Sequence, residues 1–458
     1  MGFVLSVLYF VTTYLGTDTV FGSLAAYHVE MITAAIVVFI SLPSLPKSFL
    51  FKTPQTVALA GLTLGVFFSV LFTGWVGGAV QAFQSFIPNA FGYFLICLHC
   101  NSKRKLQIIV LLLIFVCFFV IAQASIELST VAPQIAAGQA GAVAPYLLGQ
   151  RNDAGQWFYR IRGQNLINDP NDFAQLIACT VPLTFIFWRR GKTLWNVLFV
   201  LLPVGGLLYG AYLTHSRGFL MALAAILIMA GRRRIGIIPS LLGAGALFVA
   251  ASRFGFTGGR EISAGSGAGR MELWAAAIGV LKSHPLFGVG FGNLPDYIGM
   301  TAHNSIMVCA GELGLFGFYF WSLFLLPTLR DVHALGWPKK KVDGPETTTS
   351  VEGEVNEFDE LALPPAKAIF DDAELGRLGQ LMILSFTGFL VTGFFLSRAF
   401  VLTLFVLGGI GEVGFQMALE RGLVASRLKF ARAMLYSGVL SVSLLLSVYI
   451  LLQITFAR

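Results

Sequence analysis

Charged residues are scarce in this chain of 458 residues, because Lys, Arg, Asp and Glu together make up only 12% of it, about half of the roughly 25% usual in soluble proteins. Cysteine occurs only five times. Hydrophobic residues make up 56% and the mean hydropathy is +0.77. Since a soluble protein must cover its surface with polar groups, this composition excludes a cytosolic enzyme, a disordered chain and a secreted disulfide scaffold. We predict an all-α integral membrane protein that crosses the bilayer many times.

Apolar runs of roughly 17 to 25 residues are long enough to cross the hydrocarbon core of a bilayer. The chain has candidates near 2–17, 24–42, 56–74, 79–99, 106–124, 172–188, 194–213, 218–231, 235–251, 303–329, 379–397, 399–419 and 433–456. The first and the eighth are short or interrupted, so we expect about 12–13 transmembrane helices. The first run lacks a basic start and an A-x-A-like cleavage site, so we expect it to remain as a membrane helix.

Positive charge is concentrated in the loops that follow the even-numbered runs. If the runs alternate in direction, 21 of the 31 Lys and Arg residues lie on one side of the membrane. The positive-inside rule makes this side cytoplasmic, and it accounts for the basic loops without a nucleic-acid partner. The segment 342–376, which holds ten acids and one base, lies on the same side, and we expect it to be largely disordered.

This arrangement divides the chain into seven parts. They are N-terminal membrane helices (1–124), a periplasmic loop (125–171), membrane helices with a Ser-Arg-Gly hairpin (172–251), a periplasmic loop with an amphipathic helix (252–302), a membrane helix (303–329), a disordered acidic cytoplasmic loop (330–378) and C-terminal membrane helices (379–458). Long loops in compact proteins are usually functional or disordered. Both large periplasmic loops carry Arg and Gly among apolar residues, so we expect the chemistry there.

Arg217 lies in a Ser-Arg-Gly turn at the outer end of a membrane helix. Such an arginine can snorkel or pair structurally, but the turn and its place opposite the positive side favour an anion contact. Arg270 follows the glycine-rich stretch 265–269 and begins a helical pattern. The pattern places four apolar residues on one face: Met271, Trp274, Ile278 and Leu281. We expect this helix to lie on the membrane, with Arg270 at a hinge beside it; a flexible linker with an incidental arginine is the alternative.

His303 and Asn304 open the next membrane helix. The positive end of the helix dipole favours a neutral imidazole, which can accept a proton. The alternative is a histidine that caps the helix or lies among lipid headgroups. Arg160 and Arg162 in the first periplasmic loop could contact an anionic donor, but we favour a solvated loop charge as the interpretation of each.

Other polar residues suggest structural roles. We interpret Cys97 and Cys100 as core cysteines, because nothing nearby completes a tetrahedral metal site. The glycines at 288, 290 and 292 follow a helical pattern rather than a strand, so we interpret them as turn residues. Three carboxylates fall inside predicted spans, where we expect paired or structural roles for at least two of them: Glu30, Glu312 and Glu412. No metal site and no cofactor is visible in the periplasmic loops.

Several of these features, in this order, resemble the bacterial O-antigen ligase and O-antigen polymerase superfamily. They are the turn Leu213 to Gly218 followed by an apolar run, the helix from Arg270 to Trp274 with Pro285 and Gly288, and His303-Asn304 followed after nine residues by Gly314-x-x-Gly317. The stretch NDPNDFA at 168–174 is also similar to one in exopolysaccharide-associated members. The resemblance runs from Asn168 to Gly317.

The resemblance implies a C-superfamily-like membrane glycosyltransferase that takes a glycan from undecaprenyl diphosphate on the periplasmic face of the bacterial inner membrane. By position, Arg217 and Arg270 would hold the diphosphate and His303 would serve the acceptor hydroxyl. Further substrate-binding candidates are Asn304, His215 and Arg162. Paired guanidiniums offer permanently charged, bidentate contacts without a metal ion, which suits a metal-independent reaction.

The acceptor distinguishes two forms of this activity. A ligase attaches the glycan to lipid A core, whereas an O-antigen or exopolysaccharide polymerase attaches it to another glycan. The motif after His303 resembles ligases, and the stretch at 169–174 resembles polymerases. A lipid-linked sugar transporter or flippase is a second alternative, disfavoured because the two halves show no internal repeat and the charged candidates lie at the outer face. Membrane lipids are the remaining expected partners.

Overall fold

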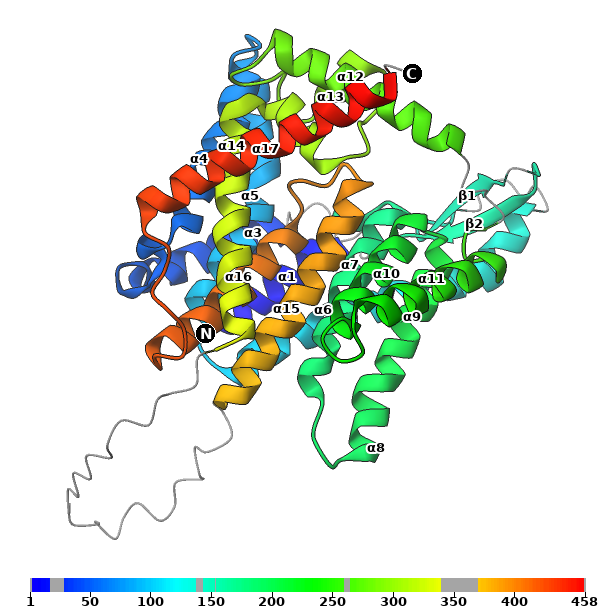
Figure 1. Cartoon of the computed structure of the whole chain (residues 1–458), viewed down its shortest axis with the longest axis horizontal. Helices are drawn as coiled ribbons and strands as arrows, with labels where there is room; N and C mark the ends of the chain where they lie inside the picture. Colours follow the sequence, from blue (N-terminus) through cyan, green and yellow to red (C-terminus); the bar gives the residue numbers. More distant parts are fainter. Residues whose placement is uncertain are drawn as a thin grey trace.

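The computed structural model describes residues 2–16, 29–136, 143–152, 154–258, 264–338 and 370–456, without the side chains of Glu30, Lys47 and 264–268. This part of the chain is a bundle of helices with one two-stranded antiparallel sheet (Figure 1). The prediction of an all-α integral membrane protein is confirmed.

The elements up to the hairpin are α1 (Gly2–Leu15), α3 (Val29–Ser41), α4 (Pro54–Leu71), α5 (Val76–His99), α6 (Lys103–Ala136), β1 (Leu147–Arg151) and β2 (Trp157–Ile161). The central elements are α7 (Pro170–Thr184), α8 (Thr193–Asn196), α9 (Leu202–Thr214), α10 (Arg217–Gly231) and α11 (Ile237–Arg253). The remaining helices are α12 (Ala264–Ser283), α13 (Leu294–Ile298), α14 (Ser305–Gly336), α15 (Asp372–Phe394), α16 (Leu402–Glu420) and α17 (Phe430–Phe456). A short π-helical segment, Val197–Leu201, joins α8 to α9.

Each predicted apolar run coincides with a helix of the structure. Within the described residues, seven helices are long and apolar enough to cross a membrane, and four more apolar helices are shorter. The expected total of 12–13 crossing helices stays a prediction. The helix α14 is central, because it packs against α4, α15, α16 and α17. Close packing there depends on glycine: a Cβ added at Gly379 would lie 2.2 Å from the backbone nitrogen of Gly336, as expected where small residues let helices approach.

The helix α14 is interrupted at Gly314, whose φ is +63°. A turn after α12 supplies partners for the backbone groups that this kink leaves unbonded. The amides of Leu315 and Phe316 donate to the carbonyls of Pro285 and Leu286 at 2.8 and 3.1 Å. Such pairing is required at membrane depth, where no water replaces a lost hydrogen bond. The turn also contains the three glycines at 288, 290 and 292, all with positive φ, which confirms that they are turn residues.

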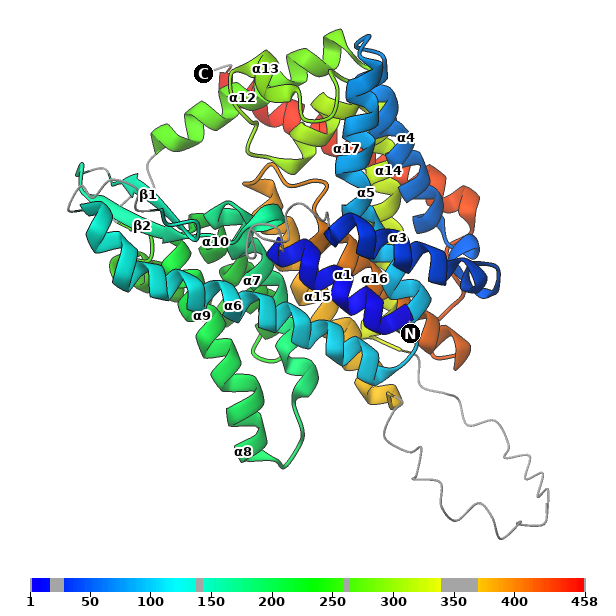
Figure 2. The same cartoon turned by 180° about the vertical axis from the view of Figure 1, so that it is seen from behind.

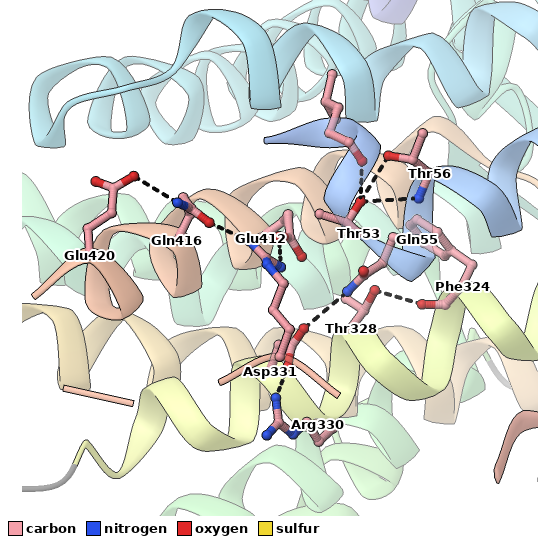
Figure 3. A network of polar contacts seen from close by, with 12 residues as sticks. Thr53, Gln55, Thr56, Phe324, Thr328, Arg330, Asp331, Glu412, Gln416 and Glu420 are labelled. Carbon is pink, nitrogen blue, oxygen red and sulfur yellow. Dashed lines mark hydrogen bonds and ion pairs between the residues drawn. The ribbon is translucent and has the colours of Figure 1, made fainter. Parts of the chain in front are cut away.

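Charged side chains inside the bundle are paired, as Figure 3 shows for a network that joins α4, α14 and α16. Asp331 accepts from Gln55 at 3.2 Å and from Arg330 at 2.6 Å. Glu412 forms an ion pair with Arg427. The backbone amides of residues 292 and 294 bond to Glu312. Paired or structural roles are thus confirmed for Glu312 and Glu412, while the side chain of Glu30 lies outside the described residues.

The predicted cytoplasmic loops gather at one end of the bundle. Lys103 at the start of α6 contacts Glu374 of α15 at 2.5 Å. Arg421 after α16 contacts Asp372 at 3.3 Å, and Arg377 donates to the Trp188 carbonyl at 3.1 Å. The loops assigned to one side by charge are therefore neighbours in space. Which side of the membrane they face stays a prediction.

Three predicted boundaries are wrong. The helix expected to end at 124 continues as α6 to Ala136, and the loop 125–171 contains the β1–β2 hairpin. The helix expected at 303–329 runs to Gly336, and α15 begins at Asp372. The predicted loop 330–378 therefore has helical flanks, and only 339–369 lies outside the described residues. Asp371 and Glu374 form a capping box at the start of α15, where acidic residues are favoured by the helix dipole.

Candidate active site

A cavity of about 590 Å³ lies at the end of the bundle opposite the basic loops. Its lining brings together the N-terminus of α10, one face of α12 and the segment between α13 and α14: Arg217, Gly269, Arg270, Glu272, Leu273, Ala276, Ile298, Met300 and His303. Figures 1 and 2 show α12 at the upper end of the molecule, with α10 below it. The three residues that the sequence singled out for catalysis thus line one cavity.

The turn between α9 and α10 positions Arg217. His215 ends α9 in a left-handed conformation with φ 49°. Ser216 then caps α10, because its side chain accepts from the Phe219 amide at 3.4 Å. Arg217 is consequently the first residue of α10, at the end where the helix dipole and unbonded amides favour an anion.

A buried hydrogen-bond network fixes the conformation of this turn. The side-chain oxygen of Asn171 accepts from the Ser216 hydroxyl at 2.9 Å and from the Arg160 guanidinium at 2.9 Å. Arg160 also donates to the Thr214 carbonyl at 2.7 Å and to the side chain of Gln150 in β1 at 3.3 Å. Its side chain is buried, at 4% exposure, so the expectation of a solvated loop charge at Arg160 is wrong. Because it donates to three acceptors, this arginine ties the hairpin and α7 to the turn before Arg217.

The placement of α12 corrects two expectations. Its apolar face does not lie on the membrane, because Trp274 and Ile278 are buried against residues of α14 and α17. The Trp274 indole donates to the Ala302 carbonyl at 2.9 Å, which ties α12 to the segment that carries His303. Arg270 is also not at a hinge, because α12 already begins at Ala264. Its guanidinium lies 5.6 Å from the ring centre of Phe395, which follows α15.

His303 lies just before α14 in a left-handed conformation with φ 48°. Its backbone amide donates to the Ser397 hydroxyl at 2.9 Å, and Thr301 bonds to the same hydroxyl. Asn304 is the N-cap of α14, since its side chain accepts from the amides of residues 306 and 307. The chain after α15 therefore fixes the conformation that presents His303 to the cavity.

The charged groups near the cavity shift the pKa values of Arg270 and His303. Burial lowers the pKa of Arg270, and the charge of Arg217 lowers it further. Burial also lowers the pKa of His303, helped by the charge of Arg270, while Asp169 opposes this effect. The neutral imidazole that the sequence ascribed to the helix dipole is thus favoured chiefly by burial. The two guanidiniums are close enough to repel each other, and a bound anion would reduce this repulsion.

The other predicted binding residues lie outside the cavity lining. Arg162 donates to the Pro145 carbonyl at 3.1 Å. The His215 ring contacts the Phe256 carbonyl at 3.2 Å and lies edge-on to Phe158. Asn304 is fully buried, with its amide nitrogen unbonded. Arg162 and His215 are therefore not part of the cavity wall, and Asn304 caps the helix that follows His303.

Sequence reasoning missed four residues of this region: Asn171, Ser216, Glu272 and Ser397. Asn171 stands in the NDPNDFA stretch and Ser216 precedes Arg217, so local signals existed for both. Glu272 follows Arg270 by two residues and places a carboxylate in the wall of the cavity. Ser397 is 94 residues from His303, and no local pattern connects them.

The arrangement suits the transfer of a group from a phosphate leaving group. Two guanidiniums can each donate two parallel hydrogen bonds to phosphate oxygens. A neutral imidazole can accept the proton of an attacking hydroxyl. Apolar residues complete the wall, namely Leu273, Ala276, Ile298 and Met300. Among the residues that the structure describes, no group of three His, Cys, Asp or Glu side chains could hold a metal ion.

Two comparisons with known proteins were informative about this region. No curated protein sequence matches the chain. The family model described as O-antigen ligase matches residues 198–322. That range includes Arg217, Arg270 and His303, and therefore all three elements that form the cavity. Over residues 198–322 the chain is therefore similar to the O-antigen ligase family, which confirms the predicted resemblance to the O-antigen ligase and polymerase superfamily.

Proposed function

We propose that this protein is an O-antigen ligase-like membrane glycosyltransferase. It moves a glycan from undecaprenyl diphosphate to an acceptor hydroxyl on the periplasmic face of the bacterial inner membrane, without a metal ion. The observation that carries this proposal is the presence of Arg217, Arg270 and His303 in the lining of one cavity, inside the segment that matches the O-antigen ligase model.

In the proposed reaction, the acceptor oxygen forms a bond to the anomeric carbon of the donor glycan while the bond from that carbon to the diphosphate breaks. The electron pair of the broken bond stays on the diphosphate oxygen. His303 takes the acceptor proton, and Arg217 and Arg270 stabilise the charge that develops on the leaving group. An enzyme outside the cytoplasm has no ATP, so its donor must arrive already activated, as a lipid diphosphate is.

The second candidate is a polymerase that uses the same donor and adds the glycan to another glycan. The NDPNDFA stretch favours it, because this stretch resembles one in exopolysaccharide-associated members of the superfamily. The cavity chemistry is common to both activities. They differ only in the acceptor that reaches His303.

An acceptor competition assay separates these functions. Purified full-length protein is incubated with an undecaprenyl diphosphate oligosaccharide, together with lipid A core or with a second donor, and the products are analysed by mass spectrometry. A glycan joined to lipid A core identifies a ligase, and a lengthened lipid-linked glycan identifies a polymerase. Neither product, with movement of intact donor across a vesicle membrane, would replace both proposals with a transporter.

A further inference from the structure

A second cavity, of about 450 Å³, lies near the opposite end of the molecule from the candidate active site. It is a groove lined by residues of α14, of the segment before α17 and of the first half of α17. Figure 1 shows α17 crossing α14. Its wall is apolar apart from Arg330, a tyrosine and a serine: Leu326, Arg330, Leu428, Tyr436, Val439, Leu440 and Ser443. Cavities of this size commonly hold a ligand, and nothing in the proposed reaction uses this one.

Positive charge borders one end of the groove. Arg330 belongs to its wall and keeps about a third of its side chain exposed, although it also contacts Asp331 and the Ser426 carbonyl. Arg432 precedes Tyr436 by one helical turn, so both lie on the same face of α17. The side chain of a helical residue points toward the N-terminus of its helix. Arg432 is therefore directed toward the end of α17 that the charge distribution assigns to the cytoplasm.

The remaining charges nearby leave this end positive. Arg427 is engaged with Glu412. Glu420 keeps its negative charge but is bonded to Gln416 of its own helix, at 2.7 Å. Lys429 and Arg432 are exposed, and no carboxylate contacts either of them within the described part of the chain. The groove thus combines a long apolar wall with cations at the end predicted to reach the cytoplasmic surface.

We propose that this groove binds an anionic phospholipid of the cytoplasmic leaflet, with an acyl chain along α17 and its phosphate beside Arg330 and Arg432. Apolar contact with α14 and α17 holds the chain. The cations select a negatively charged headgroup, because basic pockets between membrane helices on the cytoplasmic side attract anionic lipids. The acidic segment 342–369 could supply negative charge to the same cations, but it offers no acyl chain for the groove.

Native mass spectrometry of the full-length protein in detergent tests this proposal. The probes are phosphatidylglycerol and phosphatidylethanolamine with identical acyl chains, added in competition. The wild type should bind phosphatidylglycerol more tightly, and Arg432→Gln should reduce this preference by about fivefold, which corresponds to roughly 1 kcal/mol for one cation at the surface. Arg104→Gln is the matched control, because Arg104 is an exposed arginine of the same predicted side on α6 and should leave the preference unchanged.

A second variant tests the apolar wall. Ser443→Trp fills the groove and should reduce the binding of both lipids, while leaving glycan transfer at the distant site intact. If Arg432→Gln failed to fold, Lys429→Gln would test the other exposed positive charge at this end of the groove. Equal binding of the two lipids by the wild type, or an unchanged preference in both glutamine variants, would overturn the proposal. If replacement of 342–369 by a linker removed the effect of Arg432→Gln, the acidic segment would be the partner of these cations.

Discussion

At the scale of single residues, the protonation of His303 depends on its neighbour Arg270. Burial and the charge of Arg270 both lower the pKa of this histidine. The imidazole of the free enzyme should therefore stay neutral to a pH below the usual value of about 6.5. The kcat/KM for transfer should be constant above that pH and should fall as the pH drops through the lowered pKa, because only the neutral ring accepts a proton.

The coupling itself can be measured without turnover. Arg270→Gln removes the positive charge that lowers the pKa of His303, so the pKa should rise toward its ordinary value. An NMR titration of ring-labelled histidine in the wild type and in the variant measures this shift. His303→Ala should also lower the rate by roughly 10²- to 10⁴-fold while donor binding persists. An unchanged pKa in Arg270→Gln would contradict the coupling of the two residues. Lost donor binding in His303→Ala would show that His303 contacts the phosphate and is not the proton acceptor.

At the scale of elements, the turn before α10 depends on the hydrogen bond between Asn171 and Ser216. Ser216→Ala removes the N-cap of α10, which costs about 1 kcal/mol, and releases the residue before Arg217. Asn171→Ala removes the same hydrogen bond from the other side. Each variant should lower kcat by up to roughly a hundredfold, because small displacements of a catalytic group are costly.

Because both changes break the hydrogen bond between Asn171 and Ser216, the double variant should lose less than the sum of the two single losses. Steady-state kinetics of the wild type, the two single variants and the double variant measures this non-additivity. Asn152→Ala, in the turn of the hairpin, is the control and should combine additively with Ser216→Ala. Fully additive losses for Asn171 and Ser216 would mean that the two residues act independently of each other.

A second prediction at this scale concerns the kink of α14. Gly314 has positive φ, and a Cβ there would lie 2.5 Å from backbone atoms of Leu286. Gly314→Ala should therefore destabilise the protein by more than about 1 kcal/mol. Gly279→Ala is the matched control, because Gly279 lies in helical α12 with nothing within 4 Å of an added Cβ, where alanine is favoured by about 1 kcal/mol. Thermal unfolding compares them, and equal unfolding temperatures would contradict the role of the kink.

How far the sequence could predict these elements depended on the distance between interacting residues. Helix caps such as Ser216 are recognisable because they act on amides two or three residues away. Arg160 was misread because its acceptors lie on three different elements, one of them 54 residues away. The face of α12 was misread because an apolar stripe fits a membrane surface and a protein surface equally well. The packing of α14 and α17 against this face distinguishes the two.

At the scale of the whole molecule, the candidate active site and the basic loops lie at opposite ends of the bundle. The long helices connect the cavity at one end with the basic loops at the other, as α14 does between Ser305 and Gly336. The positions of the apolar runs predicted this layout well, because the length of a membrane helix is set by the bilayer. The ends of the acidic loop were predicted poorly, because composition alone does not reveal that Asp371 and Glu374 cap α15.

Replacement of 342–369 by a Gly/Ser linker should therefore leave glycan transfer unchanged, since this segment joins helices at the end away from the cavity. Replacement of 342–376 should instead destabilise the protein. It removes the capping box and the Lys103 contact of Glu374. It also removes Phe370, which is 3% exposed, and loss of a buried Phe costs about 3 to 5 kcal/mol. Thermal unfolding distinguishes the two variants, and loss of transfer in a stable 342–369 variant would reveal a role for the acidic segment.

The central claim is that two arginines in one cavity stabilise a leaving lipid diphosphate. The most direct measurement is the release of undecaprenyl diphosphate from a glycan donor by purified protein, followed by mass spectrometry in the presence of a chelator. The wild type should release one undecaprenyl diphosphate for each glycan that it transfers. Arg217→Ala and Arg270→Ala should each slow release by roughly 10²- to 10³-fold, the effect of losing one such donor. Lysine replacements should restore only part of the rate, and Arg253→Ala, an exposed arginine at the end of α11, should have no effect. Release at the wild-type rate by either of the two cavity alanine variants would contradict the claim.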